Sequence, residues 1–450
     1  MARGMNGRVS QVMKETRTYF TQDSLLARVR ARITESLKAN KIAEISGSTI
    51  SNSDCIMSAL ALFTFKFPSL LKFDSARTSD KPFLHNLRTL FHIGNVPCDT
   101  YMRERLDEII PAIVRPVYTA LFSILQRSKI LEQFRFFEDY HLISVDGTGV
   151  FSSNAIHCEQ CCIKEHKNGT TTYHHQILAA ALVHPDQKVV YPLCPEPIMK
   201  SDGMQKNDCE RNALKRWVAD FRREHPHLKT VILADGLSSN EPFITILKQH
   251  KLSYILVCKE GDHAYLADWV SSADAEDKPS FTETVKDVMS TYSYMCDVPL
   301  NESKDACRVT VVSLSETKKG KTTKWMWVTD LTVDFDNIKE FTKGGRARWR
   351  IENETFNTLK NQGYEFEHNF GHGKKHLHTI LAHLMMIAFF IDQCLQHVNK
   401  RFQEALARRG SKKALWENML VCLYTFEIPD FESLYHFIVH PPPLVMPSIL

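Results

Sequence analysis

Apolar residues in the first third of the chain recur every three to four positions, the period of an amphipathic helix. This spacing is clear in residues 23–38, 53–65 and 98–126. Asp99 or Thr100 is a suitable N-cap for the third segment, because short polar side chains accept hydrogen bonds from the first free amides of a helix. We therefore predict an all-α domain over residues 1–138.

The pattern changes at His141, where short β-branched and apolar runs replace the helical period. Such runs, bounded by turn residues, predict strands. The expected strands cover residues 141–151, 172–184, 188–193, 228–236 and 252–259. The expected helices between them cover residues 206–225 and 241–250. Strands that lead into alternating helices and strands indicate a mixed α/β sheet flanked by helices.

We divide the chain into five predicted segments, of which the helical residues 1–138 are the first. Residues 139–260 form the first part of the α/β core, and residues 261–323 are a β-rich insertion with a looser polar pattern. The core resumes over 324–400 with a strand near 324–331 and helices from Asn337 onward. Residues 401–450 are a helical region that ends in a proline-rich tail, which we expect to be extended.

Charge is unevenly distributed along the chain. The formal net charge is +4, but residues 1–135 hold 20 Lys and Arg against 12 Asp and Glu, which leaves 36 against 40 elsewhere. A basic first third is typical of phosphate binding, and a solvated helical surface explains it equally well. Arg103 and Arg105, near the start of a predicted helix, are candidates for DNA contact or for packing alone.

Nothing at the start of the sequence resembles a secretory signal, so we expect a cytoplasmic protein without a membrane partner. The most apolar stretch, Ile380 to Ile391, is short for a membrane span and contains His383, which favours a buried helix. The twelve cysteines follow no pattern typical of a small disulfide-bonded domain. Reduced thiols remain available for metal binding.

Asp146 and Asp235 each end an apolar run and precede glycine. One Asp-Gly pair is usually a plain turn. Two carboxylates at the ends of strands in one sheet are more informative, because a buried carboxylate needs a metal, a basic partner or several donors.

Glu352 lies in a predicted helix, and helical periodicity separates it from Glu354. At 100° per residue, Trp349, Phe356 and Leu359 fall within about 60° of Glu352, so Glu352 belongs to the stripe expected to face the sheet. Glu354 lies on the opposite side, which we expect to face solvent. The simpler explanation for Glu352 is a helical ion pair with Arg348. Three converging carboxylates are ligands for Mg²⁺ or Mn²⁺, and two such ions support phosphodiester cleavage or transfer.

With these residues in place, the chain resembles the DDE transposases of bacterial insertion sequences, in the branch whose glutamate lies in an Arg-Trp-x-Ile-Glu helix. Residues 348–352 match that core, and the carboxylates follow the family order, with 89 residues between the aspartates and 117 more to the glutamate. The resemblance covers residues 138–400 and implies an RNase H-like catalytic core with a β insertion before the glutamate.

The resemblance also implies function. It implies metal-dependent cleavage at transposon ends and strand transfer into target DNA, by a homodimer or larger synaptic assembly that bridges terminal inverted repeats in a prokaryotic, nucleoid-associated setting. Arg348 would contact DNA phosphate. The branch has a tyrosine where this chain has Gly345, and a lysine where it has Leu359, with Lys360 as the nearest substitute. The route of strand processing, with or without a hairpin, is therefore left open.

Other charged residues near the glutamate helix are candidates for DNA contact. These are Arg350, Lys374 and Lys375, and the two lysines lie in a Gly- and His-rich connection over 363–378 that is equally well explained as a solvated loop. The histidines of this connection fit no standard metal spacing.

A denser Cys/His group lies between the first two predicted strands. It comprises His157, Cys158, Cys161, Cys162 and His166. These residues could form a structural Zn²⁺ site, although ordinary buried thiols are common.

Three alternative functions remain: a catalytically inactive DNA-binding regulator on the same fold, an RNase H-like nuclease without strand transfer, and a zinc-stabilised binding module. The last leaves the position of Glu352 unexplained.

Overall fold

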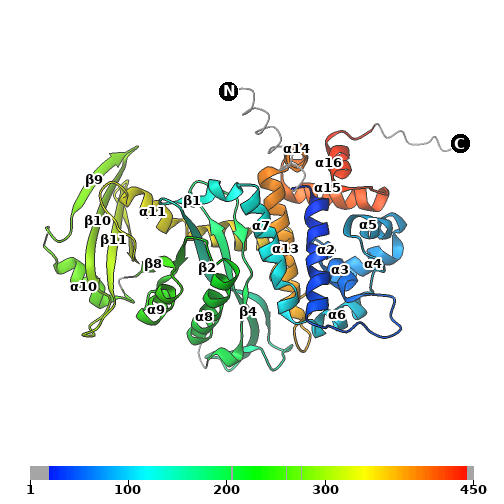
Figure 1. The fold of residues 1–450 in the computed structure, drawn as a ribbon, viewed down its shortest axis with the longest axis horizontal. Helices are drawn as coiled ribbons and strands as arrows, with labels where there is room; N and C mark the ends of the chain where they lie inside the picture. The colour runs from blue at the N-terminus through cyan, green and yellow to red at the C-terminus, as the bar shows by residue number, and fades with distance from the viewer. Residues whose placement is uncertain (1–19, 204–205, 260, 275, 443–450) are drawn as a thin grey trace. The chain divides into compact units, whose positions relative to one another are not determined.

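The computed structural model describes residues 20–203, 206–259, 261–274 and 276–442 (Figure 1). The chain forms two compact units, each assembled from separate segments. Unit 1 comprises residues 1–129, 149–175 and 357–450, and unit 2 comprises residues 130–148 and 176–356. The predicted extended end of the tail lies outside the described residues, as do the first 19 residues. The five-segment domain division remains a prediction.

Unit 1 is mostly helical. Its helices are α2 (Gln22–Ala39), α3 (Asn52–Thr64), α4 (Leu70–Ser79), α5 (Lys81–Phe91), α6 (Asp99–Glu108), η1 (Pro111–Ile113), α7 (Arg115–Arg127), α12 (Asn357–Asn361), α13 (Leu377–Val398), α14 (Lys400–Arg409), α15 (Lys412–Thr425) and α16 (Phe431–Val439). Side chains at several N-caps accept a hydrogen bond from the first turn, as with Thr21, Ser51 and Ser69. These caps satisfy amides that the helix itself leaves unpaired.

The predicted helix over 98–126 is interrupted. It forms α6, the short turn η1 and α7, and the two ends are bent by 91°. Pro111 and Pro116 account for the break, because proline lacks the amide hydrogen that an interior helical position requires. The residue that precedes α6 as its N-cap is Cys98, not Asp99 or Thr100 as predicted, and it makes no side-chain capping bond.

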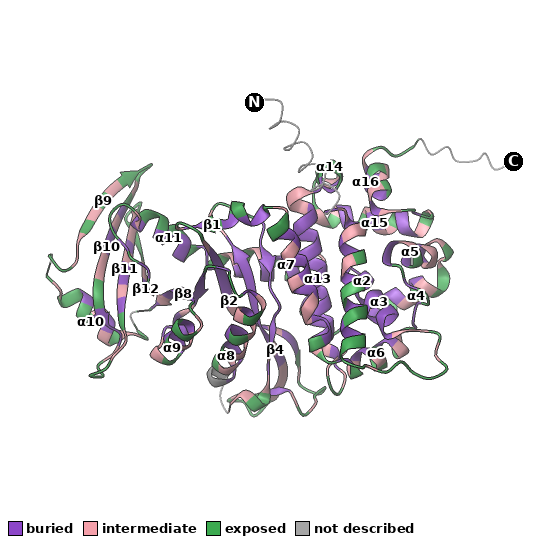
Figure 2. Ribbon diagram, viewed as in Figure 1, coloured by how far each residue is buried: buried purple, intermediate pink, exposed green. Residues whose placement is uncertain are grey.

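Helices α3 and α13 form the centre of unit 1 and pack against each other. Every residue of α3 is buried, and α13 is buried along most of its length (Figure 2). Among the described residues, α13 is the one unbroken helix long and apolar enough to cross a membrane. Its most apolar window is 94% buried inside the protein, as predicted for a core helix.

A buried ion pair joins the residue two positions beyond the end of α3 to the interior of α13. Lys66 Nζ lies 2.7 Å from a carboxylate oxygen of Asp392, which also accepts a hydrogen bond from Tyr364. The ammonium lies 4.1 Å from the Tyr364 ring centre and 4.4 Å from that of Trp416. Both charges therefore have partners, which a buried pair requires.

Unit 2 contains most of the sheet. Its strands are β1 (Arg135–Phe136), β2 (Tyr140–Ser153), β4 (Thr171–Val183), β5 (Tyr191–Pro192), β6 (Glu196–Ile198), β7 (Thr230–Ala234), β8 (Ser253–Cys258), β9 (Ser280–Val285), β10 (Val288–Pro299), β11 (Arg308–Lys318) and β12 (Lys321–Thr329). Strands β2 and β4 continue into unit 1, where the short β3 (Cys162–Glu165) pairs with the start of β4.

The helical segments of unit 2 are α8 (Lys206–Glu224), α9 (Glu241–Gln249), α10 (Ala264–Ser272), α11 (Ile338–Arg346), the turns η2 (Ile130–Phe134), η3 (Lys200–Asp202) and η4 (Gly236–Ser238), and the π-helical η5 (Ile351–Phe356). Helix α8 packs against β6, α9 against β8, and α11 against β8 and β11.

The sheet is mixed, with the order β4-β2-β7-β8-β12-β11-β10-β9 in unit 2. Strands β2, β7 and β8 run parallel to one another. From β8 onward the neighbours β8–β12, β12–β11, β11–β10 and β10–β9 are each antiparallel. Strands β9, β10 and β11 lie in the segment predicted as an insertion, and they extend the sheet as antiparallel strands that lie side by side in Figure 1. The hairpins turn at Lys286-Asp287 and at Lys319-Gly320, where positive φ angles suit two-residue turns. The predicted fold class, a mixed α/β sheet flanked by helices with a helical N-terminal region and a β-rich insertion, is confirmed.

Two glycines let α11 approach the sheet closely. A Cβ atom at Gly344 would lie 2.3 Å from the Phe136 ring, and one at Gly345 would lie 2.8 Å from the Trp327 indole. Trp327 is almost fully buried, so its ring has no room to move. This contact leaves no space for a tyrosine at position 345.

We predict that Gly345→Ala destabilises the protein by about 1–3 kcal/mol, because the added methyl overlaps a fixed ring. Without that overlap, alanine would stabilise a helix by about 0.5–1 kcal/mol. The matched control is Gly261→Ala, whose Cβ would have no neighbour within 4 Å. Urea unfolding measures both free energies, and equal values for the two variants would contradict the prediction.

Candidate functional site: a carboxylate cluster in unit 2

Asp146 and Asp235 lie on neighbouring parallel strands. The register of β2 and β7 pairs His141 with Thr230 and Ser144 with Leu233. Continued for two residues, the same register brings Asp146 beside Asp235, on strands about 4.8 Å apart. The residues before both carboxylates are buried and apolar apart from Ser144, which ties β2 to the glutamate segment by donating a 2.9 Å hydrogen bond to the Arg348 carbonyl.

The two aspartates differ in local structure. Strand β7 ends at Ala234, and Asp235 caps η4 by accepting a 3.1 Å hydrogen bond from the Leu237 amide. Strand β2, by contrast, continues past Asp146 to Ser153, so Asp146 lies within its strand and not at the end of it as expected. The reason is that β2 also pairs with β4, which keeps it extended.

Glu210 is a fourth carboxylate near Asp146. It lies on α8, and its oxygen would be 2.9 Å from a Cβ atom at Gly147. No local spacing in the sequence relates Glu210 to either aspartate, so it was not predicted as a site residue. The one available signal was the glycine itself, which permits a close approach of another group to the strand.

Glu352 lies in η5 and is held by Arg348. One guanidinium nitrogen of Arg348 is 2.7 Å from Glu352 Oε1, and another is 3.8 Å from Asp146 Oδ2. Arg348 is only 8% exposed, and its Nε is buried without a hydrogen-bond partner. The ion pair predicted as the simpler explanation for Glu352 is therefore present, and the same cation also reaches Asp146.

The prediction that Glu352 lies in a buried stripe with Trp349, and that Glu354 faces solvent, is wrong. Trp349 is 52% exposed and does not belong to a buried stripe with Glu352. The side chains of Glu352 and Glu354 are similarly accessible, at 35% and 32%. Residues 351–356 are π-helical, and wider winding shifts side chains away from the positions that 100° per residue predicts. The two glutamates differ instead in their partners, since Glu354 pairs with Arg350 at 3.1 Å.

Burial and like charge raise the pKa of Asp146 to about 7. Loss of solvent is the largest cause, and Arg348 opposes it. Glu352, Asp235 and Glu210 then raise the pKa further. The site therefore holds more negative charge than one arginine balances.

A cleft of about 780 Å³ opens beside Asp235. Arg211, Lys259, His263 and Asn240 line it together with Asp262. Cationic and amide side chains next to a carboxylate suit a polyanionic ligand that approaches the site.

The residues predicted to contact DNA mostly have partners within the protein. In unit 2, Arg350 also donates to the Pro185 carbonyl. In unit 1, Lys360 pairs with Glu367, Lys375 with Glu108 and Arg103 with Asp99. Arg105 donates to the Asn52 side chain, whereas Lys374 is exposed. DNA contact by these residues remains a prediction.

The Cys/His group in unit 1 has a different membership from the predicted one. Cys158 and Cys161 gather with His175 and His372, and the ligating atoms of these four residues lie within 4.8 Å of one another. Among the described residues this is the only such group of three or more His, Cys, Asp or Glu side chains, so the carboxylates above are more widely spaced. It could hold Zn²⁺.

The other predicted members lie outside this group. His157 stacks on Tyr173, and His166 hydrogen-bonds to Thr172 at 2.8 Å. Cys162 is buried in β3. His372 lies in the connection over 363–378, whose histidines fit no standard metal spacing. Spacing could not reveal its role, because its partners lie about two hundred residues earlier in the chain.

Comparisons with known proteins leave the family open. The sequence matches no protein-family model and no curated protein. Among solved structures, the chain is similar to a piggyBac transposase in a cryo-EM structure of its synaptic complex with hairpin DNA. The TM-score is 0.40 and the identity 11%, over 96% of this chain and 82% of that chain. A likeness of this extent does not assign a function.

We predict that Asp146 makes stability depend on pH. Its pKa rises from 3.8 to about 7 on folding, so its contribution is fully present below about pH 4 and is lost as the pH rises through 7. Between pH 5 and 8, in EDTA, the free energy of unfolding of the wild type should therefore fall relative to Asp146→Asn, by about 2–3 kcal/mol. Urea unfolding at several pH values measures this, and a constant difference would refute the assignment.

Proposed function

We propose that this protein is a DNA transposase of the DDE type, with Asp146, Asp235 and Glu352 as its catalytic carboxylates. The observation that carries the proposal is that Arg348 pairs with both Asp146, on β2, and Glu352, in the π-helical turn, while Asp235 directly follows the neighbouring parallel strand β7. This support comes from the site itself and from the resemblance over residues 348–352.

The donor set fits hard divalent cations. Carboxylate oxygens are the ligands that Mg²⁺ and Mn²⁺ prefer. Burial is the largest cause of the raised pKa of Asp146, and the neighbouring carboxylates Glu352, Asp235 and Glu210 raise it further, so a bound cation would favour the ionised form. Asp146, Asp235 and Glu352 would hold two such ions. When bound, the ions supply Lewis acidity toward phosphate oxygens at both the attacking and the leaving positions.

The chain's own residues orient these ligands. Arg348 fixes the Glu352 carboxylate by a 2.7 Å ion pair, and the Leu237 amide fixes one oxygen of Asp235 at 3.1 Å. Ser144 holds the backbone of Arg348 against β2. Arg348 is then a positioning residue in the free protein, and its contact with DNA phosphate requires that it release or share Glu352.

The proposal extends to partners and setting. The substrates would be the terminal inverted repeats of a bacterial insertion sequence and a target DNA, bound by a dimer or larger assembly in the cytoplasm of a prokaryote. The close contact between Gly345 and Trp327 means that this position cannot supply a tyrosine for end processing. Lys360 pairs with Glu367 and would have to exchange that partner for DNA.

The decisive experiment uses purified protein and DNA that carries the inverted repeats bordering the gene, with Mg²⁺ or Mn²⁺. We expect Asp146→Asn, Asp235→Asn and Glu352→Gln to retain end binding but to lose at least about 100-fold in cleavage, since even outer-shell partners of a metal cost 10–100-fold. Gel shifts measure binding, and labelled ends measure cleavage and joining.

Glu354→Gln is the matched control, because it makes the same change two residues from Glu352 and removes only the pairing with Arg350. It should cleave as the wild type does. Triad variants that cut normally would refute the assignment. Wild-type protein that binds ends without cutting would favour the regulator, and cutting without joining would favour the nuclease.

A further inference from the structure

The Cys/His group in unit 1 unites two distant segments of the chain. Cys158 and Cys161 precede β3, and His175 lies in β4, which follows it. His372 comes from the connection between α12 and α13, 197 residues after His175. Cys161, His175 and His372 are buried, and Cys158 is partly exposed.

The distances between ligating atoms match tetrahedral zinc. With Zn–S of about 2.3 Å and Zn–N of about 2.0–2.1 Å, a tetrahedron separates two sulfurs by about 3.8 Å, sulfur and nitrogen by about 3.6 Å, and two nitrogens by about 3.3 Å. The two Sγ atoms here are 3.9 Å apart, and the two Nε2 atoms are 3.1 Å apart. Three of the four sulfur–nitrogen distances are 3.5, 3.2 and 3.2 Å, and the fourth, from Cys158 Sγ to His372 Nε2, is within 4.8 Å.

The surroundings orient the histidines as metal ligands. Nδ1 of His372 lies 2.8 Å from the Gly373 carbonyl, and this hydrogen bond leaves Nε2 free of a proton and facing the other three residues. His378 stacks on His175 with ring centres 3.4 Å apart.

The connection that supplies His372 is itself anchored. The carboxylate of Asp107 accepts backbone hydrogen bonds from all four residues 374–377, at 2.9–3.0 Å. A Cβ at Gly373 would lie 2.3 Å from that carboxylate, so only glycine fits there. His372 is thus held in place by helix α6 before any metal binds.

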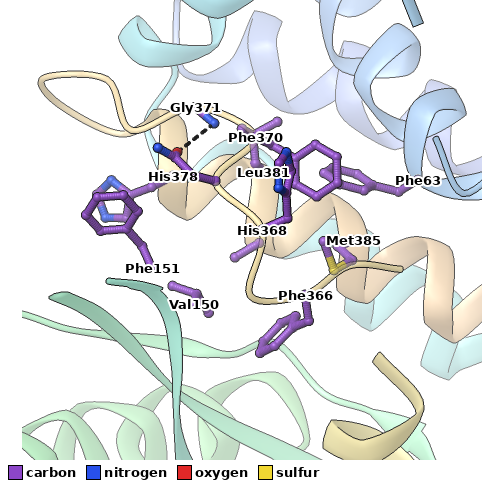
Figure 3. Close-up of a pocket in the computed structure, with 12 residues that line it drawn as sticks. Phe63, Val150, Phe151, Phe366, His368, Phe370, Gly371, His378, Leu381 and Met385 are labelled. Atoms are coloured by element: carbon purple, nitrogen blue, oxygen red, sulfur yellow. Dashed lines mark hydrogen bonds between the residues drawn. The ribbon is translucent and has the colours of Figure 1, made fainter. Parts of the chain in front are cut away.

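The neighbouring cavity is too small for an organic ligand. It measures about 30 Å³ and is lined by apolar side chains that include Phe63, Phe370 and Met385 (Figure 3). Phe151 and His378 face it from the side of the Cys/His group (Figure 3). Four protein ligands without an open position for substrate are typical of structural zinc.

We propose that Cys158, Cys161, His175 and His372 bind one structural Zn²⁺, which fastens the β3–β4 hairpin to the helices of unit 1. Four protein ligands close the coordination sphere, so the ion takes no part in chemistry. Because the ligands come from separate segments, binding stabilises the folded unit relative to the unfolded chain. This proposal stands independently of the carboxylate site.

The test measures metal content and coordination. Full-length protein purified without chelator should contain one Zn²⁺ per chain by elemental analysis. X-ray absorption should give two sulfurs at about 2.3 Å and two nitrogens at about 2.0 Å. Replacement by Co²⁺ should give the visible absorption of a tetrahedral site, and chelation should lower the melting temperature.

Variants separate this ligand set from the one predicted by spacing. His372→Cys should keep the metal and change the shell to three sulfurs and one nitrogen, a readout that does not depend on activity. Cys161→Ser should lose the metal, whereas the controls His157→Ala and His166→Ala should retain it.

Three outcomes would overturn the proposal. The first is a folded wild-type protein without zinc that also fails to take up Co²⁺. The second is loss of metal in the His157 or His166 variant with an unchanged shell in His372→Cys. The third is a disulfide between Cys158 and Cys161 in the native protein.

Discussion

The carboxylate site depends on one buried cation. Arg348 lies between Glu352 and Asp146 and is the one positive charge that directly contacts this group of acids among the described contacts. Buried carboxylates are costly unless they are paired, and a buried arginine is costly for the same reason. Each therefore stabilises the other. The Ser144 hydroxyl fixes the arginine backbone against β2, so strand and helix are aligned by the same few contacts.

Arg348 compensates only in part for the burial of Asp146 and for the carboxylates around it. The pKa of Asp146 still rises to about 7, because burial and three neighbouring carboxylates outweigh the guanidinium. Sites in which environment shifts a pKa this far are frequently functional. Two glycines permit close packing around the sheet: Gly147 admits Glu210 to strand β2, and Gly345 admits Trp327 to helix α11. Larger residues at either position would push these elements apart.

The Cys/His group bears on the stability of the hairpin that contains β3. The hairpin that contains β3 is short, and Ile163 in this strand is 47% exposed, so burial of its apolar surface contributes little. In the proposed zinc site, four ligands from two segments would replace that missing burial with bonds to a metal. The Asp107 carboxylate prepares the second segment by satisfying four backbone amides. The carboxylate site and the Cys/His group are thus stabilised by distinct interactions, one electrostatic and one coordinative.

Local patterns in the sequence determined most of the elements, because apolar periodicity depends on near neighbours. They predicted strands β2, β4, β7 and β8, the helices between them and the β-rich insertion, and they selected Asp146 and Asp235. Periodicity failed where the chain departs from regular geometry: at Pro111, which breaks the helix over 98–126, and in the π-helical turn of Glu352. Only the tertiary structure decided which side chains meet. Glu210, His175 and His372 reach their partners through strand pairing and loop anchoring across many residues, and no local spacing rule encodes such contacts.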